Sequence, residues 1–340
     1  MNKKSFDTYA GSKALVTGGL GFIGSNLAAR LVELGAEVTV VDSLIPEYGG
    51  NLYNIREFKD QVRVNLSDMR DPWSIRTLVR DQDFIFNLAG QVSHTDSMDD
   101  PQTDLDINCK AQLSLLEACR SENPQAVIVF AASRQQYGRP RELPVTEEHP
   151  LVPVDVNGIN LVAGEGFHLL YHQVYDMRTI SLRLTNTYGP HQLMKHDRQG
   201  FVTTFIRRAL HGEDLMVFGD GSQLRDFTYV TDVVSAFLES ALCEAAFGNA
   251  LNVGGQEPVS LLDVATLCQE LAGEGGKVDA APWPPGRERI DIGSIYVDHS
   301  RLTGLTGWEP VVSLRDGLER TFAFYREHGS EYWAVPEEVA

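Results

Sequence analysis

A glycine-rich turn between an apolar strand and a helix is the feature that most constrains the fold of this chain. Ala14–Thr17 has the composition of a buried strand, and Gly24–Leu34 has the pattern of a helix. In the connecting TGGLGFIG, Gly18 permits a tight turn, Gly21 lets the backbone approach a pyrophosphate, and Gly24 lets the helix pack closely on the strand. Because a helix that begins here offers free N–H groups to an anion, the segment predicts a dinucleotide site.

The alternation of strand and helix continues through the first half of the chain. Short runs rich in β-branched residues are separated by helical patterns such as Ala111–Glu122. Mostly continuous apolar strands indicate a parallel sheet that helices cover on both faces. We therefore expect an α/β fold, a Rossmann-type doubly wound parallel sheet. The strands expected after the first are Glu37–Val41, Gln61–Asn65, Phe84–Leu88, Ala126–Phe130 and Thr179–Leu184.

Proline and glycine cluster in the last third, for example at Gly219–Gly221 and Ala281–Gly286. Because such clusters interrupt the helical patches, we expect a smaller C-terminal domain over the open end of the sheet. The expected boundaries are residues 1–190 for the dinucleotide-binding domain, with a segment at about 225–255 returning to it, 191–330 for the smaller domain, and 331–340 for a frayed polar tail that begins near Tyr332.

Two acidic residues follow predicted strands. Asp42 follows the second strand, where a carboxylate accepts both ribose hydroxyls of an adenosine and repels a 2′-phosphate. The nearest following arginine is Arg56, so NAD is favoured over NADP as the cofactor. Asp68 follows the third strand, where it meets the adenine edge or caps the next helix. For Asp42 the alternative is a loop acid without a ligand.

Charge and composition exclude several classes of partner. The 340 residues include 29 Lys and Arg against 47 Asp and Glu, a net charge of −18, which argues against nucleic acid. No stretch reaches the roughly 18 apolar residues that span a bilayer, and the start lacks a secretory signal pattern. We therefore expect no membrane association and a cytoplasmic location. The four cysteines form no CxxC pair, and we expect no metal site.

Four motifs, in order along the chain, indicate a family. TGGLGFIGSNL, NLAGQVS, RLTNTYGP and GSQLRDFTYVTDV together resemble the extended short-chain dehydrogenase/reductase family, and within it the NAD-dependent nucleotide-sugar epimerases, dehydratases and decarboxylases. FNLAGQVSHTDSMDDP looks most like the epimerases, the CDP-tyvelose 2-epimerase type among them. The resemblance implies a smaller domain that holds a nucleoside-diphosphate sugar. It also implies a homodimer built on two long helices, about Thr103–Glu122 and Asn157–Tyr175.

The same resemblance implies which residues meet the ligands. For the cofactor it implies Gly18, Gly21, Phe22, Ile23, Gly24, Asp42, Asp68, Leu88, Ala89, Gly90 and Asn108. On the substrate side, Asn186 lies where family members meet the diphosphate, and Arg225 matches the family's diphosphate arginine. A second phosphate-facing arginine is Arg287 or Arg289, and the spacing leaves that choice open. For Arg225 the alternative is a structural ion pair with Asp226 or another acid.

The family's catalytic pattern is only partly present. It combines a Ser or Thr with a Tyr that removes a hydroxyl proton and a Lys, the last two spaced as YxxxK. Ser133 matches the first position, but Asn157 stands where the Tyr is expected and Leu161 where the Lys is expected. Asn has no proton to lose near neutral pH and Leu carries no charge, so the usual base is absent.

Another group must then take the proton, unless the protein only binds its ligands. We expect the catalytic residues to be Ser133 together with Tyr137 or His94. A packing role is the alternative for Tyr137, and a structural histidine is the alternative for His94. Tyr171, which follows Asn157 on the same helical pattern, fits a core position better.

The two residues after Ser133 distinguish between reactions in this family. The dehydratases carry an Asp–Glu pair there and the decarboxylases a Glu at the second position, whereas this chain has Arg134 and Gln135. Neither acts as a carboxyl acid or base, which favours an epimerase that oxidises its sugar transiently. A dehydratase or decarboxylase of the same family and a non-catalytic sugar-nucleotide binding protein are the alternatives.

Overall fold

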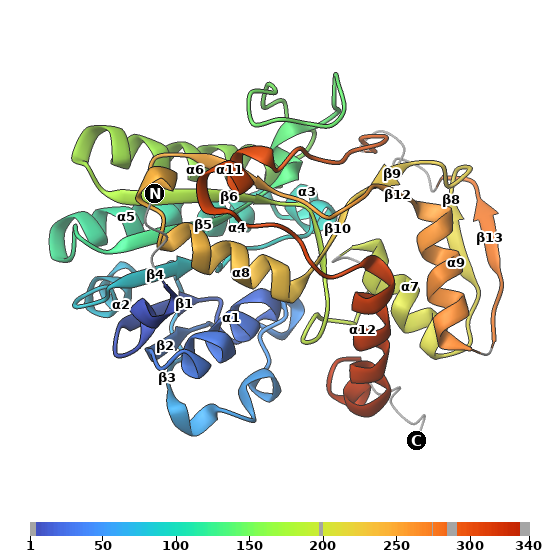
Figure 1. Ribbon diagram of the computed structural model, residues 1–340, viewed down its shortest axis with the longest axis horizontal. Helices are drawn as coiled ribbons and strands as arrows, with labels where there is room; N and C mark the ends of the chain where they lie inside the picture. The colour runs from blue at the N-terminus through green and yellow to red at the C-terminus, as the bar shows by residue number, and fades with distance from the viewer. Residues whose placement is uncertain (1–4, 197–199, 274, 284–290, 334–340) are drawn as a thin grey trace.

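A seven-stranded parallel sheet forms the centre of the computed structural model, which describes residues 5–196, 200–273, 275–283 and 291–333. The strand order is β3-β2-β1-β4-β5-β6-β11, so the chain starts in the middle of the sheet and winds outward in both directions (Figure 1). This is the doubly wound Rossmann arrangement predicted from the sequence. The strands are β1 (Lys13–Thr17), β2 (Glu37–Val41), β3 (Val62–Asn65), β4 (Phe84–Asn87), β5 (Val127–Ser133), β6 (Arg178–Leu184) and β11 (Ala250–Val253).

Successive side chains of the strands enter two separate cores. In β1, Leu15 and Val16 are both fully buried but belong to opposite faces of the sheet. This burial on both sides explains why the central strands, such as β1 and β4, are mostly apolar. The Leu15 face is covered by α2 (Pro72–Leu78), α5 (Ala111–Glu122) and α6 (Val156–Tyr175), and the Val16 face by α1 (Phe22–Glu33), α8 (Val230–Ala241) and α11 (Ser300–Thr306).

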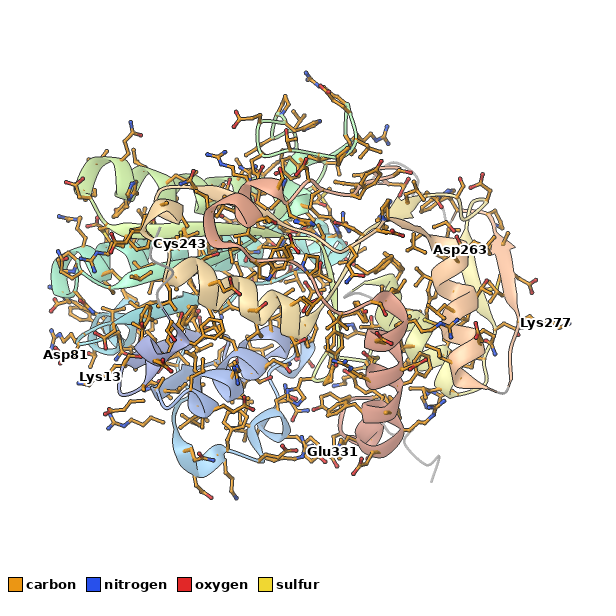
Figure 2. All side chains as sticks on the ribbon, in the orientation of Figure 1. Lys13, Asp81, Cys243, Asp263, Lys277 and Glu331 are labelled. Carbon is orange, nitrogen blue, oxygen red and sulfur yellow. The ribbon has the colours of Figure 1, made fainter. Side chains whose placement is uncertain are left out.

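A third hydrophobic core belongs to a smaller C-terminal unit, in which Phe205 and Phe322 are buried. In Figure 2, Lys13 at the start of β1 and Lys277 just before β13 lie at opposite ends of the molecule, so this unit faces the carboxyl ends of the central strands. Its helices are α7 (Phe201–Leu210), α9 (Leu261–Ala272) and α12 (Leu314–His328). Its short sheets pair β8 (Leu215–Phe218) with β13 (Val278–Ala281), β9 (Leu224–Arg225) with β12 (Val259–Ser260), and β7 (Asn186–Tyr188) with β10 (Phe227–Tyr229).

Some elements differ from the sequence-based expectations. The single helix expected over Thr103–Glu122 divides into α4 (Pro101–Leu105), a π-helical segment (Asp106–Lys110) and α5. Strand β5 continues past the expected end to Ser133, which places that serine at the carboxyl end of the strand. Tyr332, expected in a frayed tail, is buried, and its hydroxyl donates to Asn54 Oδ1 at 2.7 Å.

No helix among the described residues has the length and apolar character that a bilayer crossing requires. The described part of the chain also contains no group of three His, Cys, Asp or Glu side chains arranged to hold a metal ion. The four cysteines are free thiols, of which Cys119 and Cys268 are fully buried.

Candidate active site

A cavity of about 790 Å³ lies where the carboxyl ends of the central strands face the smaller unit. In open α/β sheets, ligands bind in this crevice. Most of the sequence-predicted site residues line it, whereas Tyr137 does not, and Arg287 and Arg289 lie outside the described residues. The predicted residues that line it are Gly18, Gly21, Phe22, Ile23, Gly24, Asp42, Asp68, Leu88, Ala89, Gly90, His94, Asn108, Ser133, Asn186 and Arg225.

The glycine turn has no room for side chains. Gly18 has a φ of +64°, and a Cβ atom there would lie 2.9 Å from the carbonyl oxygen of Leu88. A Cβ atom on Gly24 would lie 2.2 Å from the carbonyl oxygen of Gly18, because α1 starts directly against the turn. Gly21 caps α1 without a side-chain hydrogen bond, so the first turn of the helix keeps N–H groups for a ligand. An anion such as a pyrophosphate fits this end of the helix.

Asp42 is held after β2 with both carboxylate oxygens oriented. Its Oδ2 accepts a hydrogen bond from the N–H of Leu20 (3.1 Å), and its Oδ1 accepts one from the N–H of Leu44 (2.8 Å). Burial raises the pKa of Asp42, and these two N–H groups oppose that rise. Each oxygen has further lone pairs, so the carboxylate can accept two ribose hydroxyls while it repels a phosphate.

Asp68 also lines the cavity, but it does not cap a helix. Its carboxylate forms an ion pair with Arg70, whose Nη2 lies 2.6 Å from Asp68 Oδ2, and this hydrogen bond lowers the pKa of Asp68. The cap of α2 is Asp71, which accepts a hydrogen bond from the N–H of Trp73. The helix-cap alternative for Asp68 is therefore wrong, whereas its contact with an adenine stays a prediction.

The loop after β4 is fixed from two directions. From the end of β1, Thr17 Oγ1 accepts hydrogen bonds from the N–H groups of Leu88 (3.0 Å) and Ala89 (3.1 Å). From the π-helical segment, Asn108 donates to the carbonyl oxygen of Gln91 (2.9 Å) and accepts from its N–H (3.1 Å). Short π-helical segments within an α-helix, such as this one, are frequent at functional sites. Asn108 therefore orients the loop in addition to lining the cavity.

Ser133 ends β5 and caps the short 3₁₀ helix that follows, Arg134–Tyr137. Its Oγ accepts a hydrogen bond from the N–H of Gln135 at 3.2 Å, and its N–H donates to the side-chain oxygen of Gln136 at 3.2 Å. Because the serine oxygen acts as an acceptor in the protein, its O–H can donate to a ligand in the cavity.

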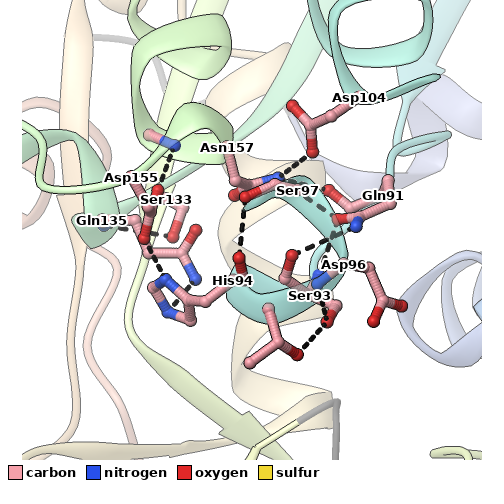
Figure 3. Close-up of polar contacts among 12 residues, drawn as sticks. Gln91, Ser93, His94, Asp96, Ser97, Asp104, Ser133, Gln135, Asp155 and Asn157 are labelled. Atoms are coloured by element: carbon pink, nitrogen blue, oxygen red, sulfur yellow. Dashed lines mark hydrogen bonds and ion pairs between the residues drawn. The ribbon is translucent and has the colours of Figure 1, made fainter. Parts of the chain in front are cut away.

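The two positions that depart from the family pattern carry no acid–base group. Asn157 Nδ2 donates to the carbonyl oxygen of Gln91 (2.7 Å) and to Asp104 Oδ2 (2.9 Å), so it ties α6 to the loop after β4 and to α4 (Figure 3). Its buried Oδ1 has no hydrogen-bond partner within the described part of the chain. Leu161 packs against Phe130 in a small apolar cluster. Neither side chain can take a proton from a substrate.

His94, the first residue of α3 (His94–Asp99), is connected to Ser133 through Gln135 (Figure 3). Its Nδ1 is hydrogen-bonded to Asp155 Oδ2, and its Nε2 to the side-chain amide of Gln135. Asp155 also caps α6 by accepting from the N–H of Gly158 at 2.7 Å. Burial alone would raise the pKa of Asp155, but the hydrogen bond and charge of His94 produce a net lowering. An ionised Asp155 keeps the proton on Nδ1 and leaves Nε2 as the basic nitrogen.

Tyr137 is separate from this group. It is fully buried, and its hydroxyl donates to Asn252 Oδ1 at 2.6 Å and accepts from Arg183 Nη1 at 2.8 Å. Burial raises the pKa of Tyr137 to about 12 in spite of the positive charge on Arg183. This geometry supports the packing role for Tyr137 and does not support its role as a base. Tyr171, on α6, is buried in the hydrophobic core that this helix shares with α5.

Arg225 lies at the other end of the cavity and is 5% exposed. It donates to the carbonyl oxygens of Leu224 (2.9 Å) and Gly293, and its Nη2 lies 3.7 Å from Asp291. Its Nε is buried without a partner in the described residues. Burial and the nearby charge of Arg134 lower the pKa of Arg225 to about 10, so it stays a cation at neutral pH. A weak ion pair with Asp291 therefore coexists with a free donor for an anion.

Asn186, at the start of β7, connects this end to the residues around Ser133. Its Nδ2 donates to the carbonyl oxygen of Asp226 (2.8 Å), and its Oδ1 accepts from Arg134 Nη2 (3.0 Å). The hydroxyl of Thr187, the next residue, is buried without a partner among the described residues. The amide of Asn186 is thus engaged by protein groups, whereas the hydroxyl of Thr187 beside it can donate a hydrogen bond to a ligand.

The sequence does not single out Asp155 as a functional residue. It draws attention to Arg134 only because the family's dehydratases carry a carboxyl group at that position. Asp155 precedes the α6 pattern in the way that a helix cap does, which signals a helix start but not a histidine partner. Its partner His94 lies 61 residues earlier in the chain, and only the fold brings the two together.

A fold and a cavity of this kind define a class: doubly wound α/β proteins that hold a dinucleotide at the carboxyl ends of the parallel strands. Within this class, residues 14–254 match the NAD-dependent epimerase/dehydratase family, and the chain belongs to that family. Over 315 residues it is 33% identical to a UDP-glucose 4-epimerase of Mycolicibacterium smegmatis, which covers 92% of this chain and 98% of that protein.

Solved structures agree with this family. An epimerase from Methanothermobacter thermautotrophicus superposes with a TM-score of 0.89 at 26% identity over 95% of both chains. A UDP-glucuronic acid 4-epimerase from Bacillus cereus, solved in complex with UDP-glucuronic acid and NAD, gives a TM-score of 0.82 at 26% identity. That match covers 93% of this chain and 99% of the other.

NAD is the cofactor of this family, and the residues present here fit it. Gly21 starts α1 without a side chain, so the N–H groups of the first helical turn are open to a pyrophosphate, while Gly18 and Gly24 let the turn and the helix pack closely. Asp42, with its oriented oxygens, suits an adenosine ribose without a 2′-phosphate.

Proposed function

We propose that this protein is an NAD-dependent nucleotide-sugar epimerase in which His94, oriented by Asp155, takes the place of the missing tyrosine base. The observation that carries the proposal is the hydrogen-bonded chain Asp155–His94–Gln135 beside Ser133, at the edge of the sheet where the cofactor turn also lies. A histidine held by a carboxylate is a common arrangement for a general base near neutral pH.

In this proposal, His94 Nε2 accepts the proton of the sugar hydroxyl that becomes a carbonyl. Gln135 gives up its hydrogen bond to that nitrogen when the hydroxyl binds. The O–H of Ser133 donates to the same sugar oxygen and stabilises the oxidised sugar, which costs little reorganisation because β5 and the 3₁₀ helix already fix the serine. When bound, NAD supplies the oxidant for the sugar carbon and the reductant that restores it.

The other end of the cavity would hold the nucleoside diphosphate. Arg225 Nε and the Thr187 hydroxyl are buried donors without described partners, and both border the cavity. Phe218 and Trp283, whose ring centroids are 5.8 Å apart, line the part of the cavity formed by the smaller unit and offer an apolar surface to a base. This supports the assignment of residues 191–330 as the mainly substrate-binding part of the chain.

Epimerisation is favoured over elimination or decarboxylation by what stands after Ser133. Arg134 and Gln135 supply no carboxyl group that could exchange protons with a substrate. Incubation with NAD and a panel of nucleotide sugars in deuterated water, followed by mass spectrometry and NMR, tests this. We expect an epimer of unchanged composition; a product that has lost water or carbon dioxide would establish the lyase alternative instead, and tight binding without any product the non-catalytic one.

We also propose that two copies associate through α5 and α6. Large apolar side chains are exposed on these helices, and several of them lie on one side of α6 at helical spacing. They are Leu113, Ile159, Leu170, Val174 and Tyr175.

Sedimentation equilibrium measures the association directly. We expect a dimer that the double change Leu170→Glu and Val174→Glu converts to a monomer, because buried charges oppose the apolar contact. As a control, Val311→Glu, at an exposed residue outside these helices, leaves the dimer intact. A native chain that stays monomeric at all concentrations contradicts the proposal.

A further inference from the structure

Arg134 is a cation in the cavity that the proposed reaction does not yet use. It directly follows Ser133 and lines the cavity. Its Nη2 donates to Asn186 Oδ1 at 3.0 Å, while its Nη1 is buried and has no hydrogen-bond partner among the described residues. Within the same residues no carboxylate lies close enough to form an ion pair with it.

The acidic groups that influence Arg134 are mostly engaged elsewhere. Asp155 is held by His94 and the N–H of Gly158, and Asp291 contacts Arg225 and accepts from the N–H of Gly293 at 3.0 Å. The Oδ2 atom of Asp226 accepts a long hydrogen bond, 3.4 Å, from the N–H of Val297, and its Oδ1 has no partner in the described chain.

An open guanidinium N–H in a buried position is costly unless a ligand supplies the acceptor. Burial lowers the pKa of Arg134, and the charges of Asp226, Asp155 and Asp291 oppose that lowering. An arginine nevertheless stays protonated at neutral pH, so the charge persists and calls for an anion.

The position of Arg134 indicates which part of a ligand supplies that anion. Under the proposed function Arg225 binds the diphosphate and the sugar reacts beside Ser133 and His94, and all three residues line the cavity. Arg134 adjoins both groups: it directly follows Ser133 and is hydrogen-bonded to Asn186, and its charge contributes to the lowered pKa of Arg225. A planar guanidinium matches a carboxylate better than it matches a neutral hydroxyl.

We propose, on the basis of the proposed function, that the sugar of the natural substrate carries a carboxylate and that Arg134 binds it. The substrate class is then a nucleoside-diphosphate uronic acid rather than a neutral hexose. Arg134 acts in this account as a specificity-determining residue and takes no part in proton transfer.

Calorimetry with UDP, UDP-glucose and UDP-glucuronic acid tests the proposal without requiring turnover. The native protein, loaded with NAD, should bind UDP-glucuronic acid about 10- to 100-fold more tightly than UDP-glucose, the effect of one charge-assisted pair. Arg134→Met should abolish this preference and leave the affinity for UDP unchanged, while Arg134→Lys should retain part of it. The unchanged affinity for UDP also shows that the variant is folded.

Arg225→Ala is the matched contrast, because it should weaken the binding of all three ligands. If Arg134→Met also weakens all three equally, Arg134 meets the diphosphate and the proposal is overturned. A native protein that binds UDP-glucose as well as UDP-glucuronic acid overturns it too. Preference for the uronic acid without any turnover would sink the epimerase proposal and leave this one intact.

Discussion

Because the side chains of Asn157 and Leu161 on α6 cannot accept a proton, the base must come from a neighbouring element. The proposed base, His94, comes from α3, and the carboxylate that orients it, Asp155, comes from the residue that caps α6. An imidazole accepts a proton near neutral pH without a neighbouring ammonium group, which a tyrosine needs. The loss of the lysine is therefore compatible with catalysis once the tyrosine is also gone.

The role of His94 is tested by His94→Asn. We expect turnover to fall by about 100- to 10,000-fold, the contribution of a general base, while the affinities for NAD and sugar nucleotide stay near those of the native protein. Steady-state kinetics and calorimetry on the same samples measure both quantities. Tyr137→Phe is the control: it lies outside the cavity, so turnover should persist although stability decreases by about 1–2 kcal/mol. Equal losses in the two variants would contradict the assignment.

Asp42 is expected to set the choice between NAD and NADP. In Asp42→Ala, the difference in binding free energy between the two cofactors should narrow by roughly 1–3 kcal/mol, because a charged acceptor is lost. Calorimetric titration of both proteins with both cofactors measures this. Comparable affinities of the native protein for NAD and NADP would show that Asp42 does not discriminate.

How far single residues can be predicted depends on the sequence range of their contacts. Gly18, Gly24 and Asp42 belong to one strand–turn–helix–strand unit, so their positions follow from local rules. The choice between Tyr137 and His94 could not be made from the sequence, because both residues follow strands whose carboxyl ends lie on the same side of the sheet. Long-range partners decide it: Asn252 and Arg183 occupy the hydroxyl of Tyr137, whereas Asp155 orients His94.

At the level of elements, the break between α4 and α5 gathers three amides around one acid. Asp104 is 1% exposed and accepts hydrogen bonds from Asn108 (3.1 Å), Asn157 (2.9 Å) and Asn160 (2.7 Å). It therefore joins α4, the π-helical segment and α6 behind the loop that follows β4. The family resemblance implies one continuous helix here, and a π-bulge changes the periodicity of the sequence by too little to detect.

Asp104→Leu should lower the free energy of unfolding by at least about 3 kcal/mol, because three buried amide donors lose their acceptor. Urea denaturation followed by circular dichroism provides the value. Asp106→Ala removes an exposed ion pair with Lys110 on the same segment and should change stability by less than about 1 kcal/mol. If the two variants are equally stable, the buried cluster does not hold these elements together.

At the level of the whole molecule, one buried histidine makes stability depend on pH. His168 is fully buried, its ring stacks on Phe130 with centroids 4.4 Å apart, and its Nε2 has no partner among the described residues. Burial lowers the pKa of His168 to about 4 from its ordinary value of 6.5. The unfolded chain takes up this proton near pH 6.5 and the folded protein only near pH 4, so the stabilising contribution is complete above pH 6.5 and is lost as the pH falls to 4.

Comparing the native protein with His168→Phe isolates this effect. Between pH 7 and about pH 4, the native protein should lose roughly 2–3 kcal/mol more stability than the variant. Asp226, whose pKa burial raises to about 6, has the opposite pH dependence, but it is present in both proteins and cancels in the difference. Parallel stability curves from urea denaturation would show that His168 is not held neutral by the fold.

The doubly wound parallel sheet was predictable from the sequence, because strand–helix alternation and the glycine turn are local signals. The way in which the smaller unit closes the cavity was not, since β7, β9 and β10 are only two or three residues long. Strands this short carry no periodic pattern, and their pairing depends on the packed core around Phe205 and Phe322.

In the proposed mechanism, this protein oxidises a bound sugar in spite of Asn157 and Leu161. Rapid mixing of the NAD-loaded protein with the sugar nucleotide that it binds most tightly, followed at the absorbance of NADH, tests it most directly. We expect a transient rise and decay of this absorbance in the native protein, slowed by about 100-fold or more in His94→Asn. A flat trace from native protein whose ligand is shown by calorimetry to be bound would contradict it.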